Sequence, residues 1–190
     1  MNVLILSSAS KNIDPYYVGI ARDISKYLAK NDFDLIFGGA SCSMMGACYD
    51  EFVRHDRNIY AFTTEKYMQD LENLKFAKPF IRETTFDLKK SMFENSDLIV
   101  ALPGGLGTLS EITSYIEENR SNDKVVPIEI YDENNYYQKF FEMLDDMKIK
   151  GFIEETIINN ISVSHNKSEF IEHISKFLID EKVRVKWKMN

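Results

Sequence analysis

The chain has 190 residues, of which 44% are hydrophobic and 28% are charged, and its formal net charge at pH 7 is −7. This length and composition are typical of one ordinary globular domain with a buried core. The acidic balance argues against general nucleic-acid binding, because proteins of that class usually carry a basic surface. No segment approaches the ~20 apolar residues that a membrane-spanning helix needs, so neither nucleic acid nor a membrane is expected as a partner.

The first strand is expected at 3–6, where a continuous apolar run is typical of a central strand. A helix follows from Asp14–Pro15, an N-cap residue and a proline at the first helical position. Further apolar runs and helical periodicities then alternate along the chain. The remaining expected strands are 33–37, 59–62, 80–84, 98–102, 125–130 and 157–163, and the expected helices are 15–30, 44–55, 66–74 (short), 86–95, 108–119, 136–148 and 168–179.

Strands that alternate with helices predict an α/β fold, a three-layer doubly wound parallel sheet with helices on both faces. The sequence shows no internal repeat or linker, so we expect one domain over 1–180. The basic segment 181–190 is expected to be a solvated C-terminal tail. In open sheets of this kind, ligands bind at the carboxyl ends of the strands, at a switch point in strand order.

Two cysteines, Cys42 and Cys48, have a spacing that matches no zinc or redox motif. The three histidines do not share the spacing of metal ligands, so no metal site is expected. The N-terminus lacks the positive segment and the long apolar run of a signal peptide. Together with the absence of a disulfide framework, these features favour a cytoplasmic protein.

Six of the eight glycines fall in two clusters, each directly after an expected strand and before an expected helix. They are Gly38, Gly39 and Gly46, and Gly104, Gly105 and Gly107. Backbone N–H groups at the start of a helix bind anions in such an arrangement, and glycine permits close approach. Ordinary α/β turns also use glycine, but two clusters together with Ser7 and Ser8 after the first strand favour a phosphate site. Neither cluster matches a P-loop or the standard dinucleotide fingerprint.

Thr108 and Glu111 have the spacing of a capping box, in which Glu111 would cap its own helix. In the alternative interpretation, the carboxylate of Glu111 points into the crevice beside a bound phosphate ester. There it could stabilise a positively charged sugar carbon. The spacing does not decide between the two.

Residues 103–111, PGGLGTLSE, are similar to the PGGxGTxxE motif of the LOG family of nucleoside 5′-monophosphate phosphoribohydrolases. Residues 38–46, GGASCSMMG, resemble the family's GGGxxGLMG loop, with Ala40 and Ser43 at two glycine positions. The segments 123–127, 136–137 and 151–153 resemble the family's downstream HDKPV, GYY and GFI segments. The resemblance runs from about residue 3 to 155.

This resemblance implies a Rossmann-like or flavodoxin-like sheet and a homodimer. It also implies hydrolysis of a nucleotide to a free base and ribose 5-phosphate, with AMP or an N6-modified AMP as the expected substrate and no cofactor. Glu111 and Lys89 are the candidate catalytic residues. The candidate substrate- and phosphate-binding residues are Ser8, Gly38, Gly39, Met45, Gly104, Gly105, Gly107 and Thr108.

The sequence departs from the family where the family has a catalytic arginine, because that position is Leu88. Leucine cannot donate a hydrogen bond to a leaving base or to a ribose hydroxyl. Either Lys89, Lys90 or Arg82 substitutes for the arginine, or the activity is altered or lost. Two alternatives to the hydrolase therefore stay open: a catalytically impaired nucleotide-binding or sensing protein of the same fold, and a sugar-phosphate transferase.

Overall fold

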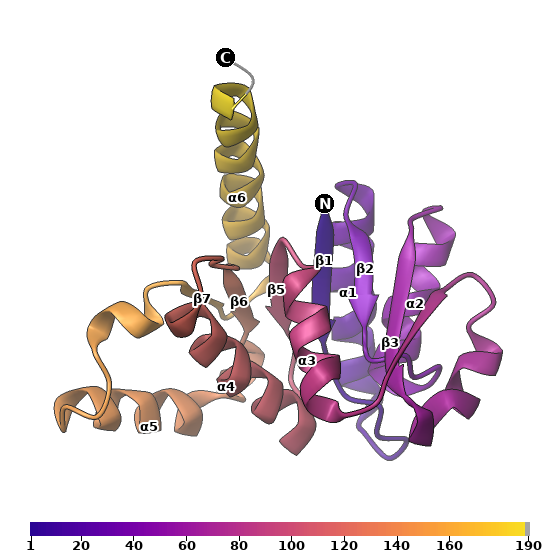
Figure 1. Cartoon of the computed structure of the whole chain (residues 1–190), viewed down its shortest axis with the longest axis horizontal. Helices are drawn as coiled ribbons and strands as arrows, with labels where there is room; N and C mark the ends of the chain where they lie inside the picture. Colours follow the sequence, from indigo (N-terminus) through magenta and orange to yellow (C-terminus); the bar gives the residue numbers. More distant parts are fainter. Residues whose placement is uncertain (189–190) are drawn as a thin grey trace.

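A computed structural model describes residues 1–188 of the chain, with side chains described through residue 181. Seven parallel strands form one sheet in the order β4-β3-β2-β1-β5-β6-β7, as Figure 1 shows in part. The predicted α/β doubly wound fold is therefore confirmed. The strands are β1 Asn2–Leu6, β2 Asp34–Phe37, β3 Ile59–Thr64, β4 Lys78–Arg82, β5 Leu98–Ala101, β6 Ile128–Tyr131 and β7 Ile161–Ser164.

Helices cover both faces of the sheet, and the alternation of side chains along each strand separates the two cores. Val3 and Ile5 of β1 pack with α1, α2 and α6, whereas Leu4 and Leu6 pack with α3 and α4. The helices are α1 Pro15–Lys30, α2 Ser43–Arg54, α3 Thr85–Glu94, α4 Leu106–Ser121, α5 Gln138–Ile149 and α6 Lys167–Lys188, with 3-10 turns η1 Glu65–Asn73, η2 Glu133–Asn135 and η3 Glu155–Ile158.

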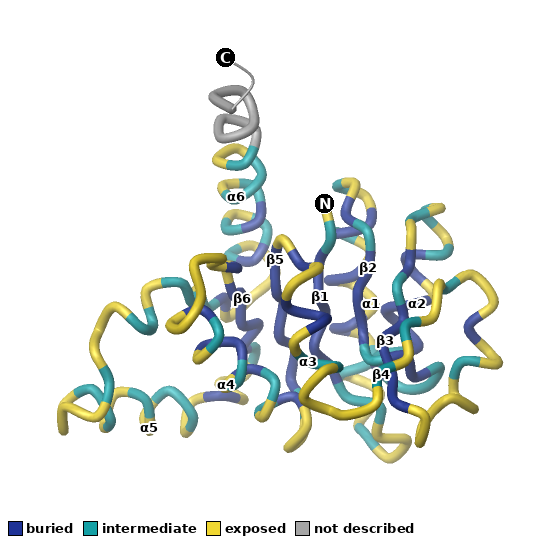
Figure 2. Tube along the Cα trace, viewed as in Figure 1, coloured by how far each residue is buried: buried dark blue, intermediate teal, exposed yellow. Residues whose placement is uncertain are grey.

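Burial follows this layering closely. The five inner strands are buried along almost their whole length, as the dark blue traces of Figure 2 show for β1, β2 and β5. By contrast, α5 projects away from the sheet (Figure 1), and all twelve of its residues remain at least partly exposed. No helix within the described residues is long and apolar enough to cross a membrane.

Local chemistry explains where two helices begin. The Asp14 carboxylate accepts a hydrogen bond from the Tyr16 N–H at 2.9 Å, and Pro15 opens α1, so the predicted helix start is confirmed. Thr84 caps α3 in the same way, because its hydroxyl oxygen accepts from the Asp87 N–H at 3.1 Å.

Several predicted boundaries were wrong by a few residues. The strand expected at 125–130 begins at Ile128, directly after Pro127, which has no N–H to donate to a sheet ladder. The segment 155–158 forms a 3-10 turn, so β7 begins only at Ile161. The last helix was expected to end at 179 but continues to Lys188. The expected basic tail 181–190 thus overlaps α6, and its side chains after residue 181 lie outside the described residues.

Candidate active site

The strand order reverses between β1 and β5, and the carboxyl ends of these two strands lie side by side. The Leu102 N–H donates to the Leu6 carbonyl oxygen at 2.9 Å, which extends the pairing beyond the strands. The segment after β1, with Ser7 and Ser8, therefore meets the glycine loop after β5. This is the switch point at which open α/β sheets bind ligands.

The second glycine loop, between β2 and α2, lies at the same end of the sheet. The Met45 N–H donates to the Ser8 carbonyl oxygen at 3.3 Å, and a Cβ on Gly38 would lie only 3.2 Å from the methyl carbon of Met45. Gly39 has φ +73°, a conformation that favours glycine. The structure thus places Ser8 and Gly38 in contact with Met45, with Gly39 next to Gly38 in the loop, and their part in binding a ligand stays a prediction.

Ser43 stands where the resembling family has a glycine, and the backbone explains that preference. Its φ is +56°, in the left-handed region, and its buried hydroxyl oxygen has no hydrogen-bond partner within the described residues. A side chain in this conformation costs about 1–3 kcal/mol. The loop that leads into α2 therefore holds strain that a glycine would relieve.

The N-terminus of α4 is open to a ligand. The N-cap is Gly105, which offers no side-chain cap, and Leu106 is 85% exposed. A Cβ built on Gly105 or on Gly107 would meet nothing within 4 Å. The first amides of α4 therefore have no side-chain cap, and uncapped amides at the start of a helix bind anions.

The capping-box interpretation of Thr108 and Glu111 is wrong. Because α4 begins at Leu106, Thr108 already lies inside the helix and cannot be its N-cap. Instead, Thr108 is buried, and its hydroxyl lies 3.5 Å from the Ser7 carbonyl oxygen. Its side chain fills the space beside Gly104, where a Cβ would lie 2.2 Å from the Thr108 hydroxyl oxygen. Thr108 thus links the β1 and β5 loops, and its contact with phosphate stays a prediction.

Two tyrosines fix the glycine loop from the other side, a role that the sequence analysis missed. The Tyr136 hydroxyl donates to the Gly104 carbonyl oxygen at 2.7 Å, and the Tyr137 hydroxyl donates to the Leu102 carbonyl oxygen at 2.7 Å. Their signal in the sequence was the pair itself, placed just after the strand that neighbours β5. Because both bonds are made to carbonyl oxygens, the loop's N–H groups stay available.

Glu111 lies one and a half turns into α4, only partly exposed to water. Its carboxylate makes no hydrogen bond or ion pair within the described part of the chain. Burial raises the pKa of this carboxyl from 4.5 to about 7, although the nearby charge of Lys89 opposes the shift. A carboxyl with a pKa near neutrality can both give and take a proton at physiological pH.

Lys89 reaches α4 from α3. Its ammonium donates to the Ser110 hydroxyl at 2.8 Å, the Ser114 hydroxyl at 3.1 Å and the Ser110 carbonyl oxygen at 3.3 Å. Leu88 is half-buried and packs against the core under α3 and α4. The sequence offered Lys89, Lys90 and Arg82 as substitutes for the missing arginine, and Lys89 is the one whose charge acts on Glu111.

The other two candidate cations are held elsewhere. Arg82 lies over the rings of Phe62 and Phe80 and donates to the Ser91 hydroxyl at 2.8 and 3.1 Å. Lys90 lies 4.0 Å from the Glu94 carboxylate, on the exposed side of α3. Neither is among the charges that act on Glu111.

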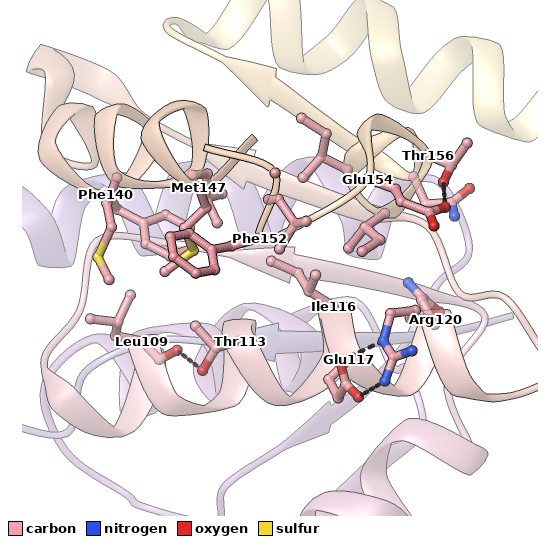
Figure 3. A pocket seen from close by; sticks show the side chains of 18 residues that line it. Leu109, Thr113, Ile116, Glu117, Arg120, Phe140, Met147, Phe152, Glu154 and Thr156 are labelled. Carbon is pink, nitrogen blue, oxygen red and sulfur yellow. Dashed lines mark hydrogen bonds and ion pairs between the residues drawn. The ribbon is translucent and has the colours of Figure 1, made fainter. Parts of the chain in front are cut away.

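A groove of about 1040 Å³ lies on a different face of α4, between that helix, α5 and the η3 segment (Figure 3). Ile116, Phe140, Met147 and Phe152 line it, and Arg120 pairs with Glu117 at one end. Neither Glu111 nor the glycine loop borders this groove. Despite its size, the groove is therefore not where the predicted site residues lie.

The histidines and cysteines have structural partners rather than a shared site. The His173 ring lies 3.1 Å from the Glu129 carboxylate, and the His165 ring lies 3.6 Å from Asp132. Cys48 is buried, and burial raises the pKa of its thiol to about 11, so it is not a nucleophile at neutral pH. No group of three or more potential metal ligands occurs among the residues that the structure describes.

Comparison with known proteins gives the following matches. A family model described as "Possible lysine decarboxylase" matches residues 45–174. A probable cytokinin riboside 5′-monophosphate phosphoribohydrolase of Oryza sativa subsp. japonica is 24% identical, over 98% of this chain and 78% of that protein. A cytokinin riboside 5′-monophosphate phosphoribohydrolase of Arabidopsis thaliana is 23% identical, over 98% and 89%.

Solved structures show the same fold. The molybdenum cofactor carrier protein of Chlamydomonas reinhardtii superposes with a TM-score of 0.71 at 14% identity, over 94% of this chain and 98% of the carrier. At that identity the similarity concerns the fold alone. The same architecture therefore serves proteins with different functions, and function must be argued from the site.

Proposed function

The chain belongs to the LOG family, and on that premise we propose that it hydrolyses the N-glycosidic bond of a nucleoside 5′-monophosphate. The products are a free base and ribose 5-phosphate, and a purine nucleotide such as AMP or an N6-modified AMP is the substrate we favour. The relatives at 23–24% identity are named for the same reaction on cytokinin riboside 5′-monophosphates. One observation carries the proposal: a carboxyl with a pKa near 7 follows, on the same helix, a glycine loop whose amides are open.

The 5′-phosphate is bound by the first amides of α4. Gly105 and Gly107 leave room for a phosphate oxygen to approach the backbone, and the helix dipole adds positive potential at that end. The loops with Ser8, Gly38 and Met45, which contact one another at the same end of the sheet, are proposed to face the phosphate from the other side. The sugar then lies over the first turns of α4, next to Glu111.

In the reaction, the bond between C1′ and the base nitrogen breaks, and its electron pair leaves with the base. C1′ gains positive charge as in other glycoside hydrolyses, and water forms the new C–O bond. The ionised Glu111 carboxylate stabilises that charge and accepts a proton from the attacking water. The base takes up a proton, so water is the only co-reactant that the balance requires.

A second candidate function follows from Leu88, whose side chain packs against the core where the family's motif has an arginine. In this alternative the protein binds a nucleotide and does not cleave it. Leu88→Arg distinguishes the two. If the chain lost hydrolysis through this position, the variant gains base release, whereas an active hydrolase releases base without it.

The experiment incubates the purified protein with a panel of nucleoside 5′-monophosphates and measures free base by chromatography. We expect base release that Glu111→Gln abolishes and that Glu117→Gln leaves intact. Glu117 is the matched control because it lies on the same helix, exposed, facing the groove between α4 and α5. Thermal stabilisation by a mononucleotide without base release from any member of the panel would support the binding protein instead.

The resemblance also implies a homodimer, which we propose for this chain. Multi-angle light scattering at several protein concentrations tests it directly. A mass near 44 kDa is expected from two chains of 22.1 kDa, and a mass of one chain at all concentrations would contradict the proposal.

A further inference from the structure

A lysine ammonium on an exposed helix usually samples many positions, because four rotatable bonds separate it from the backbone. Lys89 is different. Its three donors meet three oxygens of α4, the Ser110 hydroxyl, the Ser114 hydroxyl and the Ser110 carbonyl, at 2.8, 3.1 and 3.3 Å. An ammonium group has three protons to donate, so these contacts use all of them.

The orientation of Ser114 is also fixed. Its hydroxyl donates to the Ser110 carbonyl oxygen at 2.7 Å, so its lone pairs face the Lys89 ammonium. Ser110 and Ser114 are four residues apart on α4 and lie on the same side of that helix. The two serines thus form a prearranged acceptor pair in the turns that carry Glu111.

We propose that Ser110 and Ser114 are positioning residues that hold the Lys89 ammonium against α4, so that Lys89 acts on Glu111 through its charge and not by donating a hydrogen bond to substrate. The consequence for catalysis rests on the proposed hydrolase function of Glu111. Lys89 itself, expected from the sequence to be a catalytic residue, becomes a fixed positive charge. Ser110 becomes part of the site that holds this charge.

Few other ionisable groups of the described residues act on the charge of Glu111. The ionisable groups that interact with it from the packed elements are Lys89 on α3, Tyr115 on α4 and Tyr137 after β6. Burial raises the pKa of both tyrosines, with the charge of Glu111 a further cause, so both stay neutral at physiological pH. Lys89 is therefore the only cation among these groups, and its charge opposes the rise in the pKa of Glu111 that burial causes.

The test titrates Glu111 directly, without substrate. Protein labelled with 13C at the glutamate carboxyls is followed by NMR against pH, and the Glu111 signal is identified as the one that Glu111→Gln removes. We expect Lys89→Met to raise the midpoint by about one pKa unit, since a nearby opposite charge favours the ionised form. Ser110→Ala combined with Ser114→Ala shifts the midpoint in the same direction, whereas Ser114→Thr alone, which keeps a hydroxyl, leaves it unchanged.

Lys90→Met is the matched control, because it removes the same charge one residue along α3, beside Glu94. It is expected to leave the Glu111 midpoint unchanged. The proposal is overturned if the double serine variant titrates as the unaltered protein does while Lys89→Met shifts, or if Lys89→Met produces no shift. The dispersion of the NMR spectrum reports whether each variant is folded, and the single Ser114→Ala variant serves if the double variant unfolds.

In an active enzyme, the acid limb of the pH profile for base release moves to higher pH in Lys89→Met and in the double serine variant. In each variant this shift equals the shift of the Glu111 midpoint. A merely structural role would lower the rate without moving that limb. A protein that releases no base would refute the proposed function, yet the carboxyl titration would still decide whether the serines position Lys89.

Discussion

Replacing Glu111 by glutamine is expected to make the folded protein more stable above neutral pH. The folded carboxyl has a pKa of about 7 against an ordinary value of 4.5, because burial disfavours its ionised form. Its contribution to stability is therefore fully present below pH 4.5 and is lost as the pH rises through 7. Glutamine keeps the shape of the neutral acid at every pH, so the variant does not suffer this loss.

The size of the effect follows from the interval between the two pKa values. Each unit corresponds to 1.36 kcal/mol, so the variant gains roughly 3 kcal/mol over the unaltered protein at pH 8. The same linkage gives about 1 kcal/mol at pH 5.5 and almost no difference at pH 4. The gain should thus appear across the window between the two pKa values and level off above pH 7.

The assay is reversible urea unfolding of both proteins at pH 4, 5.5 and 8, with extrapolation to zero denaturant. Glu117→Gln is the control, because Glu117 is exposed and its pKa is lowered, first through its hydrogen bond with Arg120. A stability difference between Glu111→Gln and the unaltered protein that stays constant with pH would refute the reasoning. It would mean that the folded protein does not penalise the ionised form of Glu111.

Three further substitutions distinguish effects on stability from effects on ligand binding. Ser43→Gly should raise the unfolding free energy by about 1 kcal/mol, because glycine adopts the left-handed conformation without strain. The melting temperature should rise by about 2–4 °C. A lower melting temperature would show that Ser43 is not strained. Gly104→Ala should lose about 1–3 kcal/mol in urea unfolding, because its Cβ would meet Thr108. Gly105→Ala should change the unfolding free energy by less than about 1 kcal/mol, since its Cβ enters open space at the start of the helix. The same Cβ should weaken mononucleotide binding about tenfold, as measured by calorimetry. An unchanged affinity would argue against a phosphate site at this residue.

The sequence predicts the architecture because its main determinants are local. Continuous apolar runs such as 98–101 are typical of central strands in a parallel sheet, and Asp14–Pro15 specifies a helix start by capping alone. Element ends were less predictable. Pro127 delays β6 through a missing donor, and the first turn of α4 forms from Gly105 without any side-chain cap.

Contacts between distant residues could not be predicted from spacing. Thr108 and Glu111 fit a capping box, but α4 begins earlier, at Leu106, and Thr108 instead packs inside the helix against Gly104 and Ser7. Lys89 was one of three candidate cations, and only the crossing of α3 and α4 places it, rather than Arg82, beside Glu111.

The central claim is that the amides at the start of α4 bind the phosphate of a mononucleotide whose anomeric carbon faces residue 111. The most direct test is a crystal structure grown with AMP of the Glu111→Gln protein, which under the proposed mechanism leaves its substrate intact. Electron density for the phosphate on the N–H groups of residues 105–108, with the carboxamide of residue 111 facing C1′, is the predicted result. A nucleotide bound in the groove between α4 and α5, or a residue 111 turned away from the sugar, would contradict the account.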